Sequence, residues 1–386
     1  MKNNIMSQPK KIAWLGGYPS HYTCGLHCRL EKLFSDRLRF FYIEDQKNER
    51  DARKFEKTML PDSCEVFSNT DKLRIFHLIK KINEFDPDLI ISVGINPRPI
   101  WVIVLIYILM KKKICYWADT NIQDIFLSPK WRQFLKRLFF NLYLSKMWRI
   151  FYMGSGNRNF YIWATNRDFF NERKMFFPFA HDHNYYKEAS AKYQRNDKQP
   201  FTILSVGRLV FNKRVDLLID SVALLPVEMR KNIICNIVGY GIEKESLIQK
   251  AIQLDVRDNF NFVGAIPSDK VVDYYISADV FVLLSDTEPC PLVINESMSS
   301  GIPVITPYWV GLVSDLVVDG MTGIVLQDNN TETIAKAIIQ LYESNDYGKH
   351  LGIEGQKHIE LMGFNLETAL KSFCKLVEDL DIDNEV

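Results

Sequence analysis

Two carboxylates eight positions apart are the chemically most suggestive feature of the chain. Glu288 and Glu296 enclose the run Pro-Cys-Pro-Leu-Val-Ile-Asn, just after the apolar strand expected at Val280–Leu284. Ligands of open α/β sheets bind outside the carboxyl ends of strands, and a helix that begins there offers free N–H groups to a phosphate. The spacing therefore predicts a binding edge for a phosphorylated ligand. In the alternative interpretation, Glu288 caps the helix and Glu296 faces solvent.

Two cations follow an earlier strand and a glycine turn. The strand expected at Phe201–Val206 ends in Gly207, and Arg208 and Lys213 come directly after it. An arginine can hold phosphate oxygens with two parallel hydrogen bonds, and a lysine acts as a point charge. A diphosphate leaving group would use both cations. The alternative is a pair of ordinary surface cations in a loop.

Other glycine, histidine and cysteine groups give weaker signals. Gly16-Gly17 and Gly239-x-Gly241 are incomplete versions of the dinucleotide motif G-x-G-x-x-G. His21, Cys24, His27 and Cys28 do not have the spacing of a usual zinc site. We therefore expect no metal ion and no cofactor, and we expect His27 or Cys24 to line a cleft beside Gly17.

The segment 130–151 carries six Lys or Arg and no acidic residue, interleaved with aromatic and aliphatic side chains. Its composition is typical of an amphipathic helix that lies on an anionic membrane. An ordinary packing helix with a solvated basic face fits equally well. The residues that would contact a membrane or an acceptor are Lys130, Trp131, Arg132, Lys136 and Arg137.

The elements that must position these residues repeat twice along the chain. Apolar runs alternate with helical spacing from residue 11 and again from residue 201, which predicts an α/β protein with two Rossmann-like, doubly wound domains. We expect an N-terminal domain at 1–186, a linker at 187–200 and a C-terminal domain at 201–365. The segment 366–386 has the apolar spacing of a helix, which would dock either on its own domain or, by crossing back, on the N-terminal domain.

Composition narrows the function classes. The 386 residues are 47% hydrophobic and 25% charged, as in ordinary globular proteins, and the net charge of +1 gives no case for nucleic acid. Seven scattered cysteines indicate reduced thiols in the cytoplasm. The start of the chain has no apolar signal segment, and the longest apolar run, 100–110, is too short to span a bilayer.

The order of these motifs resembles the retaining nucleotide-sugar glycosyltransferases of family 4, which have the GT-B fold of two facing Rossmann-like domains. The resemblance covers about 201–330, where Gly207-Arg208-Leu209, Lys213, Gly239-x-Gly241 and the two glutamates occur in register with the family pattern. It continues through Gly301-x-Pro303-Val304 and Asp319-Gly320-x-Thr322-Gly323. The N-terminal half matches only in pattern.

The resemblance implies roles for individual residues. Arg208 and Lys213 would bind and stabilise the donor diphosphate, Glu288 would hold sugar hydroxyls, and Glu296 would accept hydrogen bonds from the ribose. The resemblance thus implies that Arg208, Lys213 and Glu288 would be the catalytic residues. The remaining donor-binding positions would be Gly16, Gly17, Asp119, Gly207, Gly239, Gly264, Cys290, Leu292 and Val293.

Two positions depart from the family pattern. Pro289-Cys290-Pro291 replaces a glycine-rich turn and removes two N–H donors, so that Cys290 and Leu292 should supply the rest. Ala118 stands where many members have a histidine, although Asp119 remains.

The implied activity is transfer of a sugar from a UDP- or GDP-sugar to a lipid-linked or polysaccharide acceptor in cell-surface glycan assembly. It would take place in the cytoplasm, including the inner face of the plasma membrane. A nucleotide-sugar epimerase of the same fold and a non-catalytic homologue that acts as a partner subunit stay open as alternatives. A glycoside hydrolase would also use two carboxylates, but it would not need a nucleotide.

Overall fold

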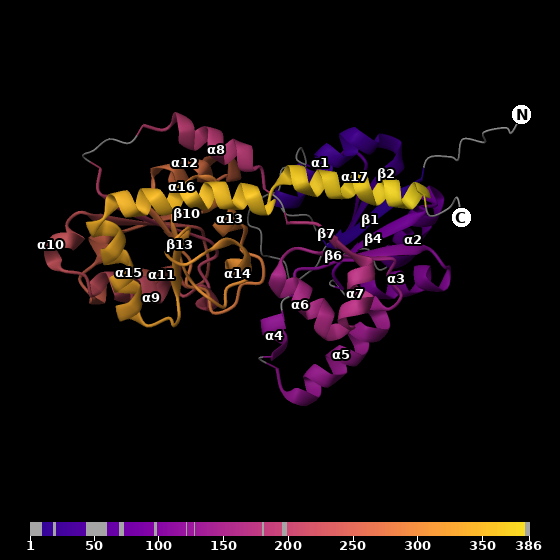
Figure 1. Ribbon diagram of the computed structural model, residues 1–386, viewed down its shortest axis with the longest axis horizontal. Coiled ribbons are helices and arrows are strands. Elements are labelled where there is room, and N and C mark those ends of the chain that lie inside the picture. Colours follow the sequence, from indigo (N-terminus) through magenta and orange to yellow (C-terminus); the bar gives the residue numbers. More distant parts are fainter. Residues whose placement is uncertain are drawn as a thin grey trace, which may run out of the picture. The chain divides into compact units, whose positions relative to one another are not determined.

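The computed structural model contains two compact units, each built on its own parallel sheet (Figure 1). Unit 1 comprises residues 1–180 and 366–386, and unit 2 comprises residues 181–365. The structure describes residues 10–17, 21–43, 60–68, 73–95, 99–120, 122–126, 128–179, 181–194 and 199–382. The side chain of His21 lies outside this description.

Unit 1 holds a seven-stranded sheet in the order β3-β2-β1-β4-β5-β6-β7, in which all neighbours pair in parallel. The chain order reverses between β1 and β4, which is where ligands of such sheets bind. The strands are β1 (Ile12–Gly17), β2 (Leu38–Ile43), β3 (Cys64–Phe67), β4 (Leu89–Val93), β5 (Lys113–Trp117), β6 (Arg149–Tyr152) and β7 (Lys174–Phe176).

Helices cover both faces of this sheet because alternate strand residues are apolar on both sides. On β1, Ala13 and Leu15 belong to the core beneath α2, α3, α5 and α6, whereas Trp14 contacts Phe373 of α17 at a ring distance of 6.3 Å. The helices are α1 (His21–Phe34), α2 (Arg74–Phe85), α3 (Pro99–Leu109), α4 (Ile122–Phe126), α5 (Lys130–Leu144), α6 (Ser155–Ala164), α7 (Arg167–Arg173) and α17 (Leu366–Ile382), with the 3-10 turn η1 (Ser35–Arg37).

The C-terminal helix α17 packs on unit 1 although the chain reaches it from unit 2. Its buried face contains Leu366, Ala369, Phe373, Leu376, Val377 and Leu380. Phe373 meets Phe34 of α1 at 5.1 Å between ring centroids, and Asp379 forms an ion pair of 3.2 Å with Arg149. Burial of one apolar face thus holds the tail on the first sheet.

Unit 2 holds a six-stranded parallel sheet in the order β10-β9-β8-β11-β12-β13. The order reverses between β8 and β11, as it does at the corresponding position of unit 1. The strands are β8 (Phe201–Val206), β9 (Ile233–Val238), β10 (Phe260–Gly264), β11 (Val280–Val282), β12 (Val304–Pro307) and β13 (Gly323–Leu326).

Two helical layers enclose the second sheet. Figure 1 shows α9, α11 and α15 on one side of it, and α8, α12 and α16 on the other. The helices are α8 (His183–Lys192), α9 (Val215–Ala223), α10 (Val227–Arg230), α11 (Lys244–Gln253), α12 (Ser268–Ser277), α13 (Leu292–Ser299), α14 (Val313–Leu316), α15 (Thr331–Glu343) and α16 (Asn345–Met362), with the 3-10 turns η3 (Phe211–Lys213) and η4 (Arg257–Asn259).

The boundary between the units differs from the one expected from the sequence. Much of the predicted linker 187–200 belongs to α8, and unit 2 begins at residue 181. Asp182 caps this helix by accepting the N–H of Tyr185 at 3.2 Å, and the buried Tyr186 meets Tyr275 at 5.9 Å. The cap and the packing of Tyr186 therefore stabilise this helix, and Lys187 adds an ion pair of 2.9 Å with Glu360.

The basic segment 130–151 is not one helix. The helix α5 ends at Leu144, and residues from Arg149 onward form β6. The backbone N–H of Trp148 already donates to Ile114 O at 2.8 Å beside the sheet. Residues from Arg149 onward pair with β5 in the sheet, so the helix ends before them although the basic and apolar pattern continues.

Candidate functional site

The predicted catalytic side chains meet at the carboxyl edge of the second sheet. Lys213 ends the turn η3 after β8, and Glu288 lies in the loop between β11 and α13. Lys213 Nζ forms an ion pair with Glu288 Oε2, and both side chains are largely buried. Because β8 and β11 are neighbours, the loops that follow them lie side by side. The sequence prediction that a cation and a carboxylate share this edge is therefore correct.

The environment of Lys213 makes its charge responsive to pH. Burial, together with the smaller effect of the nearby charge of Arg208, lowers the pKa of its ammonium group to about 8. Arg208 itself is exposed. Two cations thus lie close together, one exposed and one partly removed from water. Such an arrangement favours an anionic ligand that neutralises both.

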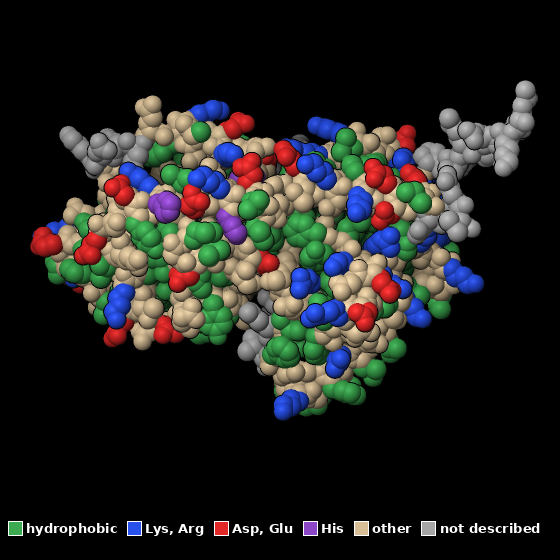
Figure 2. Space-filling model, in the orientation of Figure 1, with side chains coloured by type: hydrophobic (Ala, Val, Ile, Leu, Met, Phe, Trp, Pro, Cys, Tyr) green, Lys and Arg blue, Asp and Glu red, His purple; other side chains and the backbone are tan. Residues whose placement is uncertain are grey.

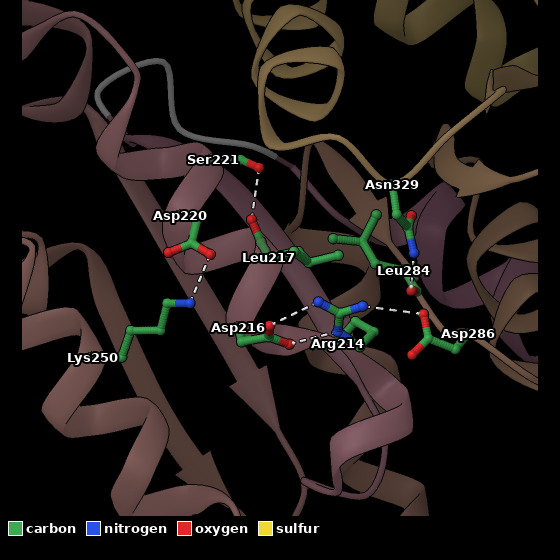
Figure 3. Close-up of polar contacts among 9 residues, drawn as sticks. All are labelled: Arg214, Asp216, Leu217, Asp220, Ser221, Lys250, Leu284, Asp286 and Asn329. Atoms are coloured by element: carbon green, nitrogen blue, oxygen red, sulfur yellow. Dashed lines mark hydrogen bonds and ion pairs between the residues drawn. The ribbon is translucent and has the colours of Figure 1, made fainter.

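A second ionic network shapes the same loops. Figure 3 shows the guanidinium of Arg214 between the carboxylates of Asp216 and Asp286. Its two bonds to Asp216 measure 3.1 Å each, and the bond to Asp286 measures 3.3 Å. The hydrogen bonds to Asp216 raise the pKa of Arg214 above its ordinary value. Arg214 therefore ties the start of α9 to the turn before Glu288.

Glycine permits the close approach of the strand-end turns. A Cβ on Gly239 would lie 1.8 Å from the carbonyl oxygen of Gly207, and φ at Gly239 is +140°. The N–H of Gly239 donates to the carbonyl of Gly264 at 2.9 Å. The predicted donor-binding glycines 207, 239 and 264 therefore form one continuous backbone surface, because any larger residue at 239 would separate the turns.

The second glutamate of the pair is buried rather than solvated. Glu296 on α13 is only 3% exposed, and Tyr275 of α12 donates its hydroxyl to Oε2 at 2.8 Å. No side chain caps this helix at its N-cap residue, Pro291, and Glu288 pairs with Lys213 instead. Both parts of the alternative interpretation, a capping Glu288 and a solvated Glu296, are therefore wrong.

The first turn of α13 presents backbone amides near this edge. The N–H groups of Leu292 and Val293 have no partner within a helix that starts at Leu292. The side chain of Leu292 is buried, and that of Cys290 is partly exposed. The predicted donor-binding residues from Cys290 to Glu296 thus lie along one loop and one helix of unit 2.

Contacts from Trp309 and Gly311, which the sequence analysis did not predict, support the loop that carries Glu288. Gly311 donates its N–H to the carbonyl of Glu288 at 2.7 Å, and its Cα faces the carbonyl of Pro289. Trp309 donates its indole N–H to Ser285 O at 3.0 Å. No motif marks these residues, because their role depends on a contact between two loops that are distant in sequence.

The other predicted donor-binding residues lie in unit 1. Gly16, Gly17 and Asp119 line a pocket of about 340 Å³ at the carboxyl ends of β1, β4 and β5. Asp119 is still exposed to solvent, while partial loss of its water shell raises the pKa of its carboxyl. The structure therefore groups the predicted residues into two clusters, one in each unit.

The same pocket is also lined by several aromatic side chains, among them Trp14, Trp117 and Phe179. His27 lines it as well, and its Nδ1 pairs with the hydroxyl of Tyr42. Burial lowers the pKa of His27 to about 3, so that the ring is neutral at physiological pH. The expectation that His27 lines a cleft beside Gly17 is correct.

An asparagine holds the loop that carries Asp119. Asn157 of α6 donates to the carbonyls of Ala118 and Thr120 at 2.9 Å each, and its Oδ1 accepts the N–H of Met153 at 3.1 Å. The side chain is buried. Three hydrogen bonds from one buried amide fix the loop despite the alanine at position 118.

The cationic residues proposed for membrane or acceptor contact lie along α5. Lys130, Trp131, Arg132 and Arg137 are exposed, and Lys136 is partly exposed. The guanidinium of Arg132 lies over the ring of Trp131 at 5.1 Å. Among the described residues, no helix is both long and apolar enough to cross a bilayer.

Comparison with known proteins identifies the second half of the chain. Residues 187–358 match the model of the family Glycosyl transferases group 1. An uncharacterized glycosyltransferase of Methanocaldococcus jannaschii, MJ1069, is 28% identical over 190 residues, which cover 49% of this chain and 48% of that protein. The lipopolysaccharide core biosynthesis glycosyltransferase LpsE of Rhizobium meliloti is 30% identical over 181 residues, which cover 45% and 49%.

The chain spans about half the length of these curated relatives. A solved structure matches nearly the whole chain. Anabaena HepE, solved in complex with UDP, superposes with a TM-score of 0.73 over 96% of this chain and 100% of the other, at 19% identity. The two parallel-sheet units therefore have the GT-B fold, and residues 187–358 are similar to the glycosyl transferases group 1 family.

Proposed function

We propose that the protein is a retaining glycosyltransferase of family 4 that moves a sugar from a UDP- or GDP-sugar to a lipid-linked or glycan acceptor in cell-surface polysaccharide or lipopolysaccharide assembly. The observation that carries the proposal is the convergence of Arg208, Lys213 and Glu288 at one sheet edge. The family match of residues 187–358 and the UDP complex of the structurally similar HepE support it.

The roles of the two cations follow from the charge that develops during sugar transfer. Breaking the bond between the anomeric carbon and the diphosphate leaves negative charge on phosphate oxygens. Arg208 and Lys213 would stabilise that charge, and removal of one such contact commonly costs about 10²–10³ in rate. Lys213 has three N–H donors, so it can hold Glu288 and a phosphate oxygen together. These cations would supply the charge without a metal ion.

Retention would need no separate general base. The acceptor hydroxyl would attack the anomeric carbon from the face of the departing diphosphate, and its proton would pass to a phosphate oxygen of that leaving group. The new C–O bond thus replaces the broken one on the same face. Glu288 would bind hydroxyls of the donor sugar, and Glu296, held by Tyr275, would accept hydrogen bonds from the ribose.

The proposal places the reaction in the cytoplasm, at the inner face of the plasma membrane when the acceptor is lipid-linked. In that setting the pocket of unit 1 lined by Gly16, Gly17 and Asp119 would contribute to substrate binding.

A thermal-shift panel of UDP, GDP and their sugar conjugates tests the donor assignment. A ligand at 100 times its Kd adds about 2.7 kcal/mol to the free energy of unfolding, which raises Tm measurably. We expect one nucleotide series to stabilise the protein, and no shift with any member would contradict the proposal. Turnover of the donor without an acceptor, giving an epimeric nucleotide-sugar, would instead identify an epimerase.

Two alanine variants then test the residues. Arg208→Ala and Lys213→Ala should each lower turnover at least tenfold while the fold survives, although Lys213→Ala should also lower Tm because it leaves Glu288 without its ion-pair partner. Lys231→Ala is the matched control, because this lysine is 62% exposed and pairs only with the neighbouring Glu228 at 2.6 Å. Wild-type turnover in both site variants would remove the phosphate assignment.

A further inference from the structure

Helix α5 has an unusual distribution of side chains. Its buried residues are Phe140, Tyr143 and Leu144, and Phe140 meets Phe160 of α6 at 5.0 Å between ring centroids. Six large apolar side chains on the same helix are between 40% and 67% exposed: Trp131, Phe134, Leu135, Leu138, Phe139 and Leu142. More large apolar side chains of α5 are therefore exposed to solvent than are buried against the protein.

The two apolar groups occupy opposite sides of the helix. Successive residues turn by about 100°, so the exposed six fall on one continuous stripe directly away from Phe140, Tyr143 and Leu144. The cations border this stripe on both edges. Lys130 and Arg137 lie along one edge, and Arg132 and Lys136 lie along the other.

The surroundings in unit 1 agree with an outward-facing stripe. Figure 1 shows α5 on the outer side of α6 and α7. Over this part of the molecule, Figure 2 shows hydrophobic and Lys or Arg side chains exposed side by side. Segment 130–151 contains no acidic residue that could neutralise the cations within the helix. An ordinary packing helix would expose its polar face and bury its apolar one.

We infer that α5 is an interfacial helix that lies in the plane of an anionic membrane, with its outer apolar stripe among the acyl chains and its flanking cations at the phosphate headgroups. Long Lys and Arg side chains reach from an apolar layer to headgroups in this way. Charge complementarity favours this occupant over a second copy. A twofold dimer through the same stripe would bring the cations of two copies together, which is repulsive.

This inference deepens the proposed membrane location by naming the surface, and it can be tested without any transfer reaction. The full chain is mixed with vesicles of phosphatidylglycerol and phosphatidylcholine, or of phosphatidylcholine alone, and binding is measured by flotation at low and high salt. We expect binding to the anionic vesicles, weaker binding to the neutral ones, and a loss of binding as salt rises. Equal binding to both vesicle types would overturn the electrostatic part of the inference.

A charge variant localises the effect. Each Lys or Arg near an anionic surface contributes about fivefold in binding, so removing four should weaken binding at least 100-fold. The variant is K130Q/R132Q/K136Q/R137Q. A control with the same net charge removes four lysines elsewhere that are also exposed, K80Q/K192Q/K231Q/K357Q. Equal loss of binding in both variants would show that net charge, and not α5, is responsible.

An apolar variant tests the stripe. Leu138→Ser with Leu142→Ser should weaken vesicle binding at least tenfold without lowering Tm, because both side chains are half exposed or more. The matched control is Ile252→Ser with Ile353→Ser, which removes two apolar side chains of similar exposure from unit 2. Light scattering measures the oligomeric state and tests the alternative that a second copy covers the stripe. A wild-type dimer that the α5 variant converts to a monomer, with vesicle binding unchanged, would overturn the inference in favour of a second copy.

Nucleotide binding separates this inference from the proposed function. The α5 variants should show the same thermal shift with the nucleotide as the wild type, since α5 belongs to unit 1 and the Lys213–Glu288 pair to unit 2. A wild-type protein that binds vesicles but no nucleotide would contradict the transferase proposal alone. One that binds a nucleotide but no vesicle would contradict the interfacial helix alone.

Discussion

Replacing Gly311 by alanine tests whether the position of the Glu288 loop controls the reaction. A Cβ at 311 would lie 1.9 Å from the carbonyl oxygen of Pro289 and 2.7 Å from that of Glu288. Real Cβ atoms do not approach other atoms closer than 3.0 Å, so the two backbones must separate by about 1.1 Å, the difference between 3.0 and 1.9 Å. The neighbouring atoms are backbone and cannot rotate away.

A displacement of this size should have a large effect on the rate of catalysis and a moderate effect on the stability of the fold. A misplacement of about 1 Å can cost about 10²-fold in rate when it moves a positioning group. Overpacking commonly costs about 1–3 kcal/mol. We therefore expect Gly311→Ala to lower kcat/KM for the donor about 100-fold and the free energy of unfolding by about 1–3 kcal/mol, with the sheet intact.

The assay combines initial rates below Tm, at several donor concentrations, with denaturant unfolding. Gly348→Ala is the control, because a Cβ there meets only the side chain of Leu341 at an ordinary 3.7 Å, and alanine suits a helix interior. A Gly311→Ala protein with wild-type Tm and kcat/KM within twofold would refute the reasoning. It would mean that the Glu288 loop does not depend on this contact.

Two further predictions concern charge and loop support. Because burial lowers the pKa of Lys213 to about 8, this group is charged below that pH and neutral above it. The kcat/KM for the donor should therefore fall as pH rises through about 8. The variant Lys213→Arg should abolish that fall, because arginine stays charged. A wild-type profile that is flat from pH 7 to 9.5 would contradict this role. In unit 1, Asn157→Ala removes three hydrogen bonds that hold the loop at Asp119. Calorimetry should show that the free energy of unfolding falls by about 1–3 kcal/mol. An unchanged Tm would show that other contacts hold this loop.

The sequence determined much of the architecture because long apolar strands report burial on both faces of a sheet. The runs at 11–15, 38–43 and 201–206 predict buried parallel strands, and they correspond to β1, β2 and β8, although β1 continues through the two glycines that were expected to turn. The short strands β3, β6, β7 and β13, of three or four residues each, were not predicted. The equally short β11 was expected because it lies in the longer apolar run 280–284, whereas the conformation of these four strands depends on pairing with a neighbour.

The convergence of Arg208, Lys213 and Glu288 could also be predicted. The carboxyl ends of parallel strands share one edge, so residues that follow β8 and β11 must lie close together once these strands are neighbours. The sequence also predicted a basic amphipathic segment at 130–151, but it left open whether the apolar side chains pack or face solvent.

Only the tertiary structure decided which surfaces are covered. It buried Glu296 against Tyr275, placed Gly311 beneath the Glu288 loop, and left the apolar stripe of α5 exposed. Each of these outcomes depends on a contact between segments that are far apart in the chain. Local periodicity fixes which residues share a face, whereas the long-range packing of the other elements determines what, if anything, that face meets.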